Sequence, residues 1–458
     1  MKPEKVFKRY DIRGDYPGEI NEEFAERLGK ALGTFARRNH GDEVVVGRDN
    51  KESSQPLKQA FIGGLESVGV NVLDAGTGPT DYVAFTGMEN SSVSVQVTSS
   101  HLPLDTNGFK FMYPGGNGFL NPDLYEVQDI FREGEFEDGS SSSGEAARSS
   151  NLGENAAGGT DYVAAGARQG YLAAAKRYFG QHFDGIDRKV VVDTLGGAST
   201  EYLPHLMEQL GAEVVNIAGE REVKGPYLDP PKPEPENLGY LEERVEQENA
   251  DVAVVNDMDA DRVAVYYEGE WIPGDRLFAL LAQLIEPADM VASIDTSQMV
   301  EEVVRENGGE IHYTRVGDPF VIDETLEQDA ELSGEPNGHY CFPALVPYNS
   351  GTVAALLLAA MDIDSGLEEL REYHSERADI EVEDNLEKES RMQQVEERVK
   401  SEYSVISDLD GVKFELGEGN VLVRPSGSSP VIRVIAEARD AEAAGEICSR
   451  AEELVRNP

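Results

Sequence analysis

Short runs of apolar, mostly β-branched residues alternate along the chain with helical patterns, and the same arrangement occurs three times. In each copy, a first run is followed by a helical stretch, a glycine and a second run. A glycine after the last helical position is typical of a helix end, and strand–helix–strand units favour a parallel sheet. The copies begin roughly 100 to 150 residues apart, too wide for a solenoid, so we expect three related α/β domains. The predicted segments are Glu43–Gly47, a helix over Gln55–Val68 and Gly69–Leu73; Lys189–Asp193, a helix ending at Leu210 and Gly211–Val215; and Met290–Ile294, a helix ending at Glu306 and Gly308–Ile311.

Another helix is predicted to begin directly after Asn21. The Asn21 side chain can cap the first free N–H groups, and Glu22 and Glu23 suit the positive end of the helix dipole. The apolar residues that follow recur at helical spacing and predict one buried stripe. This stripe consists of Phe24, Leu28, Leu32 and Phe35.

The last 90 or so residues have a different rhythm, with two helical patterns before three strands and a final helix. This order predicts a smaller α+β domain. The predicted helices cover about 367–377, 390–403 and 441–455, and the predicted strands cover 412–416, 421–424 and 431–437.

Residues 136–160 are rich in Ser, Gly, Ala and Glu. Such a composition cannot form a core, so we expect a flexible connection or a disordered insertion between the first two domains.

Composition restricts the partners more than the chemistry. The 458 residues include 87 acidic and 40 basic side chains, and the net charge is −47. Nucleic acids and anionic membranes would repel such a surface, so neither is an expected partner. Only 14 of the 40 basic residues are lysine. A dispersed acidic surface suits molar salt, where the Debye length falls to about 3 Å. We interpret this composition as that of a protein from the cytoplasm of a salt-accumulating halophile. The alternative is an ordinary acidic enzyme.

The remaining sequence features agree with a soluble, cytoplasmic protein. Cys341 and Cys448 lie far apart without metal-ligand spacing, which fits a reducing interior. The first 14 residues lack the apolar core of a signal peptide, and the longest apolar run, Val353–Met361, is too short for a bilayer.

The strongest local signal for chemistry is Asn256-Asp257-Met258-Asp259-Ala260-Asp261-Arg262. Carboxylates at every second position of an extended backbone project to one side and can bind a hard divalent cation. Two alternatives are an EF-hand and a solvated acidic turn. The EF-hand is disfavoured because Arg262 occupies the position that needs glycine and because both flanks are predicted strands. Three carboxylates beside an arginine favour Mg²⁺ that also binds a phosphate.

A second candidate loop is Val97-Thr98-Ser99-Ser100-His101, which leads to Lys110. A predicted strand ends in a hydroxyl cluster beside a histidine, a suitable place for an activated serine. Taken alone, most such turns only cap helices.

A third candidate is Ser333-Gly334-Glu335-Pro336-Asn337-Gly338-His339. Its glycines and proline impose an irregular backbone around Glu335, Asn337 and His339, a set suited to vicinal hydroxyls. An ordinary surface turn is an equal alternative.

The fourth candidate is Arg424-Pro425-Ser426-Gly427-Ser428. Hydroxyls and backbone N–H groups beside a guanidinium suit a phosphate, although a simple hairpin turn is the alternative. Together the four loops predict a phosphorylated sugar as the substrate.

In this order the motifs resemble those of the α-D-phosphohexomutases, which comprise phosphomannomutase, phosphoglucomutase and phosphoglucosamine mutase. The resemblance covers nearly the whole chain. It includes the four loops above and three further motifs, which are Tyr10-Asp11-Ile12-Arg13-Gly14, Gly47-Arg48-Asp49 and Val316-Gly317-Asp318.

The resemblance implies four domains around a central cleft: three α/β domains with mixed, mostly parallel sheets and a smaller C-terminal α+β domain. The expected boundaries are 1–138, a linker or insertion at 139–160, then 161–268, 269–365 and 366–458.

The resemblance also implies the activity. Ser100 would be carried as a phosphoserine, and a hexose 1-phosphate and a hexose 6-phosphate would interconvert through a 1,6-bisphosphate. Mg²⁺ would bind Asp257, Asp259, Asp261 and the phosphorylated Ser100.

The remaining roles follow from the same resemblance. Lys110 and His339 are expected to transfer protons and relieve charge, and Arg13 and Arg262 to stabilise the transferring group. The expected substrate-binding residues are Tyr10, His101, Arg262, Gly317, Asp318, Glu335, Asn337, Arg424, Ser426, Gly427 and Ser428. We expect a monomer or homodimer.

Several positions depart from the family's usual pattern. Ser99 replaces the usual alanine, Leu102 stands where asparagine is commoner, and Lys51 falls where arginine is frequent. Asn337 and Ser428 replace the common serine and threonine. These departures bear on substrate preference more than on activity. Phosphoglucosamine mutase is the closest rival activity, because the loop from Gly334 to His339 does not settle the substituent at C2 of the sugar. An inactive sugar-phosphate-binding paralogue is a more distant alternative.

Overall fold

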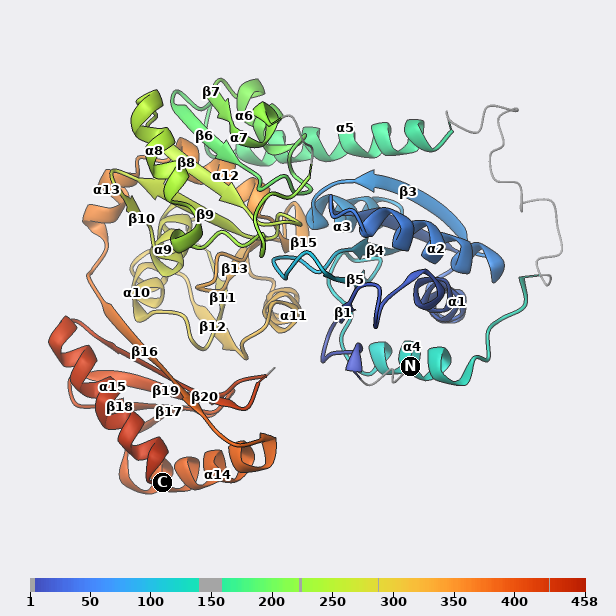
Figure 1. Ribbon diagram of the computed structural model, residues 1–458. Coiled ribbons are helices and arrows are strands. Elements are labelled where there is room, and N and C mark those ends of the chain that lie inside the picture. Colours follow the sequence, from blue (N-terminus) through green and yellow to red (C-terminus); the bar gives the residue numbers. More distant parts are fainter. Residues whose placement is uncertain (1–4, 140–158, 222–224, 287, 428) are drawn as a thin grey trace. The chain divides into compact units, whose positions relative to one another are not determined.

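Three pairs of parallel strands form the repeated unit that the sequence predicts. The computed structural model describes residues 5–139, 159–221, 225–286, 288–427 and 429–458 (Figure 1). Each pair is joined by a connection that contains a helix, as a parallel pair requires. The pairs are β2 (Glu43–Arg48) with β3 (Asn71–Thr77), β6 (Lys189–Asp193) with β7 (Glu213–Asn216), and β11 (Met290–Ser293) with β12 (Ile311–Thr314). The prediction of a threefold repeat is confirmed.

The chain divides into two compact units, and each is described by itself. The first unit comprises Met1–Ile272 and Gly338–Met361, and the second comprises Pro273–Asn337 and Asp362–Pro458. No helix in the described ranges combines the length and apolar character needed to cross a bilayer.

The first sheet has the strand order β1-β5-β4-β2-β3, with β1 and β5 antiparallel to their neighbours. Helix α1 is capped as predicted, because Asn21 Oδ1 accepts a hydrogen bond of 3.0 Å from Phe24 N. The predicted stripe is buried in the core of this domain, where α1 packs on α2 and α4. The other elements are β1 (Ile12–Asp15), α1 (Glu22–Asn39), α2 (Ser54–Ser67), α3 (Thr80–Glu89), β4 (Val93–Val97), β5 (Thr106–Met112) and α4 (Asp123–Glu133).

The second sheet repeats this arrangement in the order β10-β9-β8-β6-β7. Its parallel strands β6 and β8 are largely buried, and β8 and β9 form an antiparallel pair. The predicted linker at 139–160 lies almost wholly outside the described residues, and α5 begins at Gly159. The elements are α5 (Gly159–Phe179), α6 (Leu203–Gln209), α7 (Ile217–Glu220), the 3₁₀ turn Pro235–Asn237, α8 (Gly239–Glu248), β8 (Val252–Asn256), β9 (Val263–Tyr267) and β10 (Glu270–Trp271).

The first unit also contains a hairpin and a buried helix from a later part of the chain. Strands β14 (Tyr340–Phe342) and β15 (Val346–Asn349) are antiparallel and lead into α12 (Gly351–Ala360). Helix α12 is apolar on every side because it contacts α5, α6, β8 and β9.

The second unit begins with the parallel strands β12, β11 and β13. Helices α10 and α13 pack on α9, and α11 packs on the strands. The bounds are α9 (Gly274–Leu284), α10 (Gln298–Glu306), α11 (Asp318–Gln328), β13 (Leu332–Gly334) and α13 (Ile363–Glu369).

The C-terminal part of the second unit is an antiparallel sheet in the order β16-β20-β19-β18-β17. Helix α15 packs along this sheet against β16, β19 and β20 (Figure 1). The bounds are β16 (His374–Glu381), α14 (Asn385–Glu402), β17 (Val405–Ser407), β18 (Val412–Leu416), β19 (Gly419–Pro425), β20 (Val431–Ala438) and α15 (Ala441–Arg456).

One element was predicted wrongly. The helix expected over about 367–377 ends with α13 at Glu369, and residues from His374 onward form strand β16. Strand β16 lies at the edge of the sheet and exposes most of its polar side chains. An edge strand of this kind carries no apolar alternation, and its strand structure comes from the eight-residue register with β20.

Candidate active site

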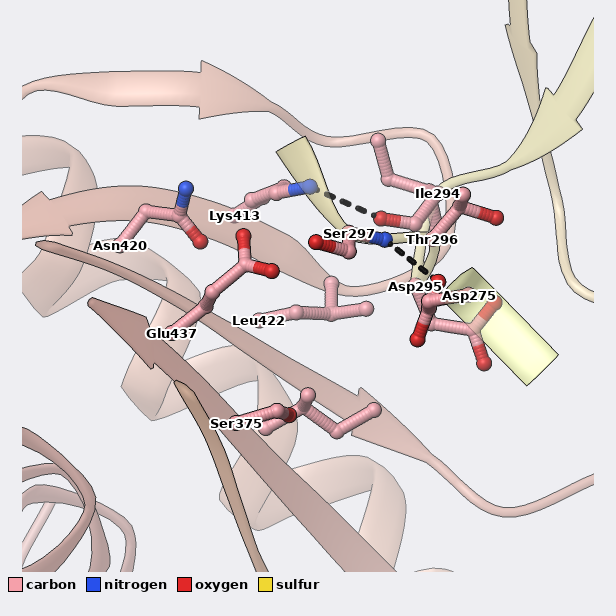
Figure 2. A pocket seen from close by; sticks show the side chains of 11 residues that line it. Asp275, Ile294, Asp295, Thr296, Ser297, Ser375, Lys413, Asn420, Leu422 and Glu437 are labelled. Atoms are coloured by element: carbon pink, nitrogen blue, oxygen red, sulfur yellow. Dashed lines mark hydrogen bonds between the residues drawn. The ribbon is translucent and has the colours of Figure 1, made fainter. Parts of the chain in front are cut away.

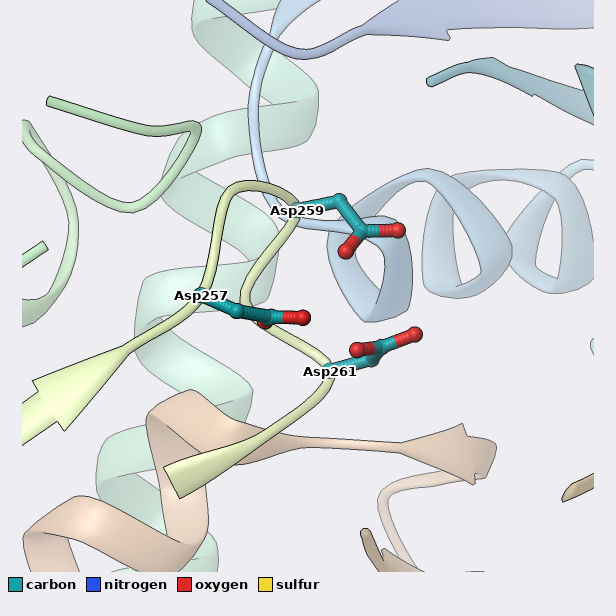
Figure 3. Close-up of side chains that lie close together, drawn as sticks. All are labelled: Asp257, Asp259 and Asp261. Carbon is teal, nitrogen blue, oxygen red and sulfur yellow. The ribbon is translucent and has the colours of Figure 1, made fainter. Parts of the chain in front are cut away.

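Three aspartates lie on the turn between the antiparallel strands β8 and β9. One oxygen from each of Asp257, Asp259 and Asp261 can be chosen so that all three atoms lie within 4.8 Å of one another. Figure 3 shows the three carboxylates converging on one region beside the turn. All three side chains are buried, with at most 1% of the residue exposed. Both flanks are strands, which agrees with the argument against an EF-hand.

The donor set fits a hard divalent cation. Asp259 Oδ1 is buried and accepts no hydrogen bond from any residue that the structure describes. An orphaned buried carboxylate oxygen is costly unless a cation or a donor reaches it. Three carboxylate oxygens leave further coordination positions open, as Mg²⁺ usually requires in phosphate chemistry. Asp257, Asp259 and Asp261 are therefore suited to hold Mg²⁺.

Lys110 on β5 supplies one positive charge to the cluster. Its Nζ lies 2.7 Å from Asp259 Oδ2 and 2.6 Å from Asp261 Oδ2. Burial alone would lower the pKa of Lys110, but the two carboxylates outweigh burial and hold that pKa well above its ordinary value. One ammonium offsets only part of the negative charge that the three carboxylates carry when ionised, so the ionised cluster favours a divalent cation.

The remaining carboxylates respond to burial and to one another. Burial, followed by repulsion from Asp261 and Asp259, raises the pKa of Asp257 well above its ordinary value. Burial acts in the same direction on Asp261, but Lys110 and His339 outweigh it and hold the Asp261 pKa well below its ordinary value. Asp257 therefore holds its proton more tightly than Asp261 does.

Ser100 follows β4 and points at this cluster. Its Oγ donates a hydrogen bond of 3.1 Å to Asp257 Oδ2 and lies 3.2 Å from His101 Nδ1. The backbone of Ser100 is left-handed, with φ of +53°, and its N–H donates to Thr98 Oγ1 at 2.8 Å. A non-glycine residue persists in that conformation only where its surroundings impose it.

Two histidines and an arginine complete this part of the site. Arg262 Nε donates to His339 Nε2 at 3.0 Å, and His339 Nε2 lies 3.4 Å from Asp261 Oδ1. Burial, together with the nearby charges of Arg262 and Arg13, lowers the pKa of His101 to about 2. His101 is therefore neutral at pH 7.

Arg13 and Tyr10 belong to the N-terminal motif. Arg13 lies on β1 opposite Gly108 of β5, and its Nε is 2.6 Å from Asp11 Oδ2. Tyr10 directly precedes this segment and is partly buried.

Two residues that the sequence analysis did not single out hold the aspartate turn in place. Thr80 at the start of α3 donates to Asp259 twice, from Oγ1 to Oδ2 and from N to O, both at 3.0 Å. Gly351 N donates to Ala260 O at 3.0 Å, and a Cβ at Gly351 would lie only 2.2 Å from Arg262 O. These contacts bring together distant segments of the chain, so no local sequence signal identifies them.

The predicted sugar-binding residues Gly317, Asp318, Glu335 and Asn337 lie in the second unit. Gly317 caps α11 with φ of +131°, and its N–H donates to the buried Glu335 Oε1 at 2.9 Å. Asp318 begins α11, and Asn337 is exposed after β13. The structure therefore joins the Gly317 and Glu335 loops.

The predicted phosphate loop also lies in the second unit, at the end of β19. Arg424 donates from Nε and Nη2 to Asp410 Oδ2, at 2.9 and 2.7 Å. Lys388 on α14 donates to Ser426 O at 2.7 Å and Ser429 O at 2.8 Å, which is a loop contact that the sequence analysis missed. Gly427 is exposed at the turn, and Ser428 lies outside the described residues.

A separate polar pocket in the second unit contains none of the predicted site residues (Figure 2). Lys413 Nζ donates to Ile294 O at 3.1 Å, and Ser297 N donates to Asp275 Oδ1 at 2.8 Å. Burial, with smaller contributions from Glu437 and Asp295, raises the pKa of Asp275 to about 7.

Comparison with known proteins gives the family. Four models of phosphoglucomutase/phosphomannomutase domains match in order: alpha/beta/alpha domains I, II and III over residues 4–138, 169–270 and 273–378, and the C-terminal domain over 379–454. A Thermococcus kodakarensis protein named phosphoglucomutase/phosphomannomutase is 32% identical over 459 residues, which is 96% of each chain. This chain belongs to the phosphoglucomutase/phosphomannomutase family.

Further relatives of this phosphohexomutase agree. A Methanopyrus kandleri protein named probable phosphoglucosamine mutase is 32% identical, covering 99% of this chain and 98% of its own. The crystal structure of a phosphoglucomutase/phosphomannomutase family protein from Burkholderia thailandensis has a TM-score of 0.83 at 24% identity, covering 100% of this chain and 98% of that one, and supports the fold. The resemblance seen in the motifs is confirmed, and the protein is an isomerase of the phosphohexomutase type.

Proposed function

We propose that this phosphohexomutase interconverts the 1-phosphate and 6-phosphate of glucose or mannose through a phosphorylated Ser100. The observation that carries the proposal is the hydrogen bond between Ser100 Oγ and Asp257 Oδ2, which aims the hydroxyl at the aspartate cluster. Seryl oxygens are weak nucleophiles unless their surroundings activate them, and a buried cluster suited to a divalent cation is such a surrounding.

Each half of the reaction moves one phosphoryl group. In the first half, the bond between phosphorus and Ser100 Oγ breaks, a bond to the free sugar hydroxyl forms, and that hydroxyl releases its proton. The product is a hexose 1,6-bisphosphate. In the second half, the phosphoryl group at the other end of the sugar returns to Ser100 Oγ, and the sugar oxygen left behind takes up a proton.

The charged residues around Ser100 have complementary tasks. Arg262 and Arg13 stabilise the negative charge of the transferring group. His339 is the candidate that takes up and returns the sugar proton, and the Lys110 ammonium, whose pKa is held above its ordinary value, relieves charge. Asp257, Asp259, Asp261 and the phosphorylated Ser100 would hold Mg²⁺. When bound, the cation offsets phosphate charge and so favours in-line phosphoryl transfer.

The other predicted residues bind the sugar and the phosphate that is not being transferred. We assign Gly317, Asp318, Glu335 and Asn337 to the sugar hydroxyls, with Tyr10 and His101 as further contacts. We assign Arg424, Ser426, Gly427 and Ser428 to the second phosphate. Lys388 supports this loop, because its ammonium holds two of the loop carbonyls.

Phosphoglucosamine mutase is the second candidate activity. It is favoured by the Methanopyrus kandleri relative of that name, which matches over 99% of this chain. The two activities differ in the group at C2 of the sugar, an amine in place of a hydroxyl.

A mutase assay with the 1-phosphates of glucose, mannose and glucosamine distinguishes them. The assay contains molar KCl, Mg²⁺ and catalytic hexose 1,6-bisphosphate. Ser100→Ala is the inactive variant, and Ser94→Ala, a buried serine on β4, is the matched control. Turnover of glucose or mannose phosphate that Ser100→Ala abolishes supports the proposal. A clear preference for glucosamine phosphate favours the second candidate, and no turnover of any of the three by the folded protein contradicts both.

A further inference from the structure

Lys51 holds the loop that carries Ser100. It follows β2 and is 2% exposed, so its ammonium lies inside the first unit. Lys51 Nζ donates to Ser99 Oγ at 2.5 Å, and Ser99 Oγ donates in turn to Thr106 O at 2.8 Å. The other acceptors of Lys51 Nζ are the carbonyl oxygens of Leu102, Pro103 and Thr106, at 2.9, 3.0 and 3.1 Å.

This arrangement differs from an ordinary buried ion pair. Within the described part of the chain, no carboxylate oxygen lies within the 4.0 Å ion-pair distance of Lys51 Nζ, whereas the equally buried Lys58 pairs with Asp74 Oδ1 at 2.5 Å. A buried ammonium without a paired carboxylate is costly in free energy. The Lys51 ammonium donates its hydrogen bonds to neutral oxygens, all of which belong to residues 99–106.

Asp49, two residues before Lys51, binds the same loop at Thr98. Asp49 Oδ2 accepts from Thr98 Oγ1 at 2.7 Å, and Thr98 Oγ1 accepts from Ser100 N at 2.8 Å. Asp49 Oδ1 also accepts from Lys51 N at 2.9 Å, which ties the two holding residues together. Ser100, in its left-handed conformation, therefore lies between two sets of hydrogen bonds that start from one short segment.

We propose that Lys51, together with Ser99, is a positioning residue that keeps Ser100 Oγ aimed at Asp257. The inference rests on the proposed role of Ser100 and adds the device that fixes its geometry. Among the described residues, Lys51 Nζ forms no hydrogen bond or ion pair with Ser100 Oγ, Asp257, Asp259 or Asp261, so it acts through the loop.

The same contact makes the residues at positions 51 and 99 depend on each other, because Lys51 Nζ donates directly to Ser99 Oγ. Ser99 Oγ accepts from Lys51 Nζ and donates to Thr106 O, to which Lys51 Nζ also donates. The larger guanidinium of an arginine at position 51 would clash with Ser99 Oγ, because only 2.5 Å separates that atom from Lys51 Nζ. Lys51→Arg should therefore function well only when combined with Ser99→Ala.

The test compares Lys51→Met with Lys58→Met. Lys58 is similarly buried, but its ammonium pairs with Asp74 and forms no hydrogen bond to residues 98–106. We measure kcat, KM and the rate at which glucose 1,6-bisphosphate phosphorylates Ser100, followed by intact mass. A shift of about 1 Å in a reacting group costs on the order of 100-fold in rate. We therefore expect Lys51→Met to lower kcat and the phosphorylation rate by about 10- to 100-fold with KM nearly unchanged, while Lys58→Met keeps its kcat.

Two further variants keep the test decisive if Lys51→Met does not fold. Ser99→Ala should lower kcat several-fold, and Lys51→Arg/Ser99→Ala should exceed Lys51→Arg alone. Equal kcat values for Lys51→Met and Lys58→Met overturn the inference, as does an unchanged kcat in Ser99→Ala.

Failure of the proposed function would give a different result. The wild-type protein would then neither turn over hexose phosphates nor accept a phosphoryl group. Hydrogen exchange of residues 98–106 still tests the positioning, because Lys51→Met should accelerate exchange there and Lys58→Met should not. Equal exchange in the two variants overturns the inference independently of the activity.

Discussion

Ser100 Oγ and Asp257 Oδ2 are joined by a hydrogen bond of 3.1 Å, although 157 residues separate them in the chain. Ser100 follows a strand of the first sheet, and Asp257 follows a strand of the second. The first two sheets therefore each contribute one strand end to a single cluster within the first unit. The serine comes from the first sheet, and the carboxylates suited to the cation come from the second.

Mg²⁺ should stabilise the folded protein through the aspartate turn. Binding to the folded state alone adds about 2.7 kcal/mol to the free energy of unfolding at a free Mg²⁺ concentration of 100 Kd. Thermal unfolding in EDTA and in MgCl₂ measures this as an increase in Tm. Asp259→Asn should lose most of the increase, and Asp295→Asn, a substitution in the polar pocket of the second unit, should keep it. A full increase in Asp259→Asn would refute the assignment of the cation to this turn.

The stability of the protein should fall as the buried Asp81 ionises. Burial raises the pKa of Asp81 to about 6 in the folded state, from 3.8. The folded state then binds the proton more tightly, so stability is fully present below about pH 4 and is lost as pH rises through 6. About two pH units correspond to about 3 kcal/mol.

Urea unfolding of wild type and Asp81→Asn in EDTA, between pH 4 and 7, isolates this contribution. The variant cannot ionise at this position, so the wild type should lose about 3 kcal/mol relative to it over that range. A difference that stays constant with pH, or that changes in the opposite direction, contradicts the pKa shift.

Salt should stabilise the chain. At a net charge of −47, the acidic side chains of the folded protein repel one another. Raising the salt from 0.1 to 1 M weakens this repulsion, because it shortens the Debye length from about 10 to about 3 Å. Tm should therefore rise steadily with KCl, by more than it rises in sucrose of matched osmolality. A Tm that is independent of KCl would remove the support for the halophilic interpretation of the composition.

Arg424→Ala should weaken substrate binding more than it slows phosphoryl transfer. A charged hydrogen bond contributes about 1.5 to 3 kcal/mol, so KM should rise by about 10- to 100-fold. Arg433→Ala is the matched control, because Arg433 lies opposite Arg424 in the register of β19 and β20 and pairs with Asp379. If Arg424→Ala lowered the rate of Ser100 phosphorylation by bisphosphate as strongly as it raised KM, the anchoring role would be wrong.

Elements with a local signal were predictable from sequence. The Asn21 cap and the stripe of α1 lie within one helix, and the threefold repeat follows from strands whose apolar runs are continuous. Strand β16 was not predictable, because its side chains are mostly polar and its structure depends on β20.

In the candidate site, too, some residues were predictable from the sequence and others were not. The motifs identify the candidate residues, and the structure brings Ser100, Lys110, His339 and the aspartates together. The supporting residues Thr80, Lys51 and Lys388 contact loops far away in the chain, and each looks ordinary in its own segment. Their roles depend on tertiary packing, which hydrophobic periodicity does not report.

The intact mass of the protein after incubation with glucose 1,6-bisphosphate and Mg²⁺ tests the central claim most directly. Wild type and Ser94→Ala should gain the mass of one phosphoryl group and lose it when hexose monophosphate is added, with the bisphosphate as the product. Ser100→Ala should gain nothing. A wild-type protein that is folded and binds Mg²⁺ but never gains the phosphoryl group, or a Ser100→Ala variant that gains it equally, would contradict the account.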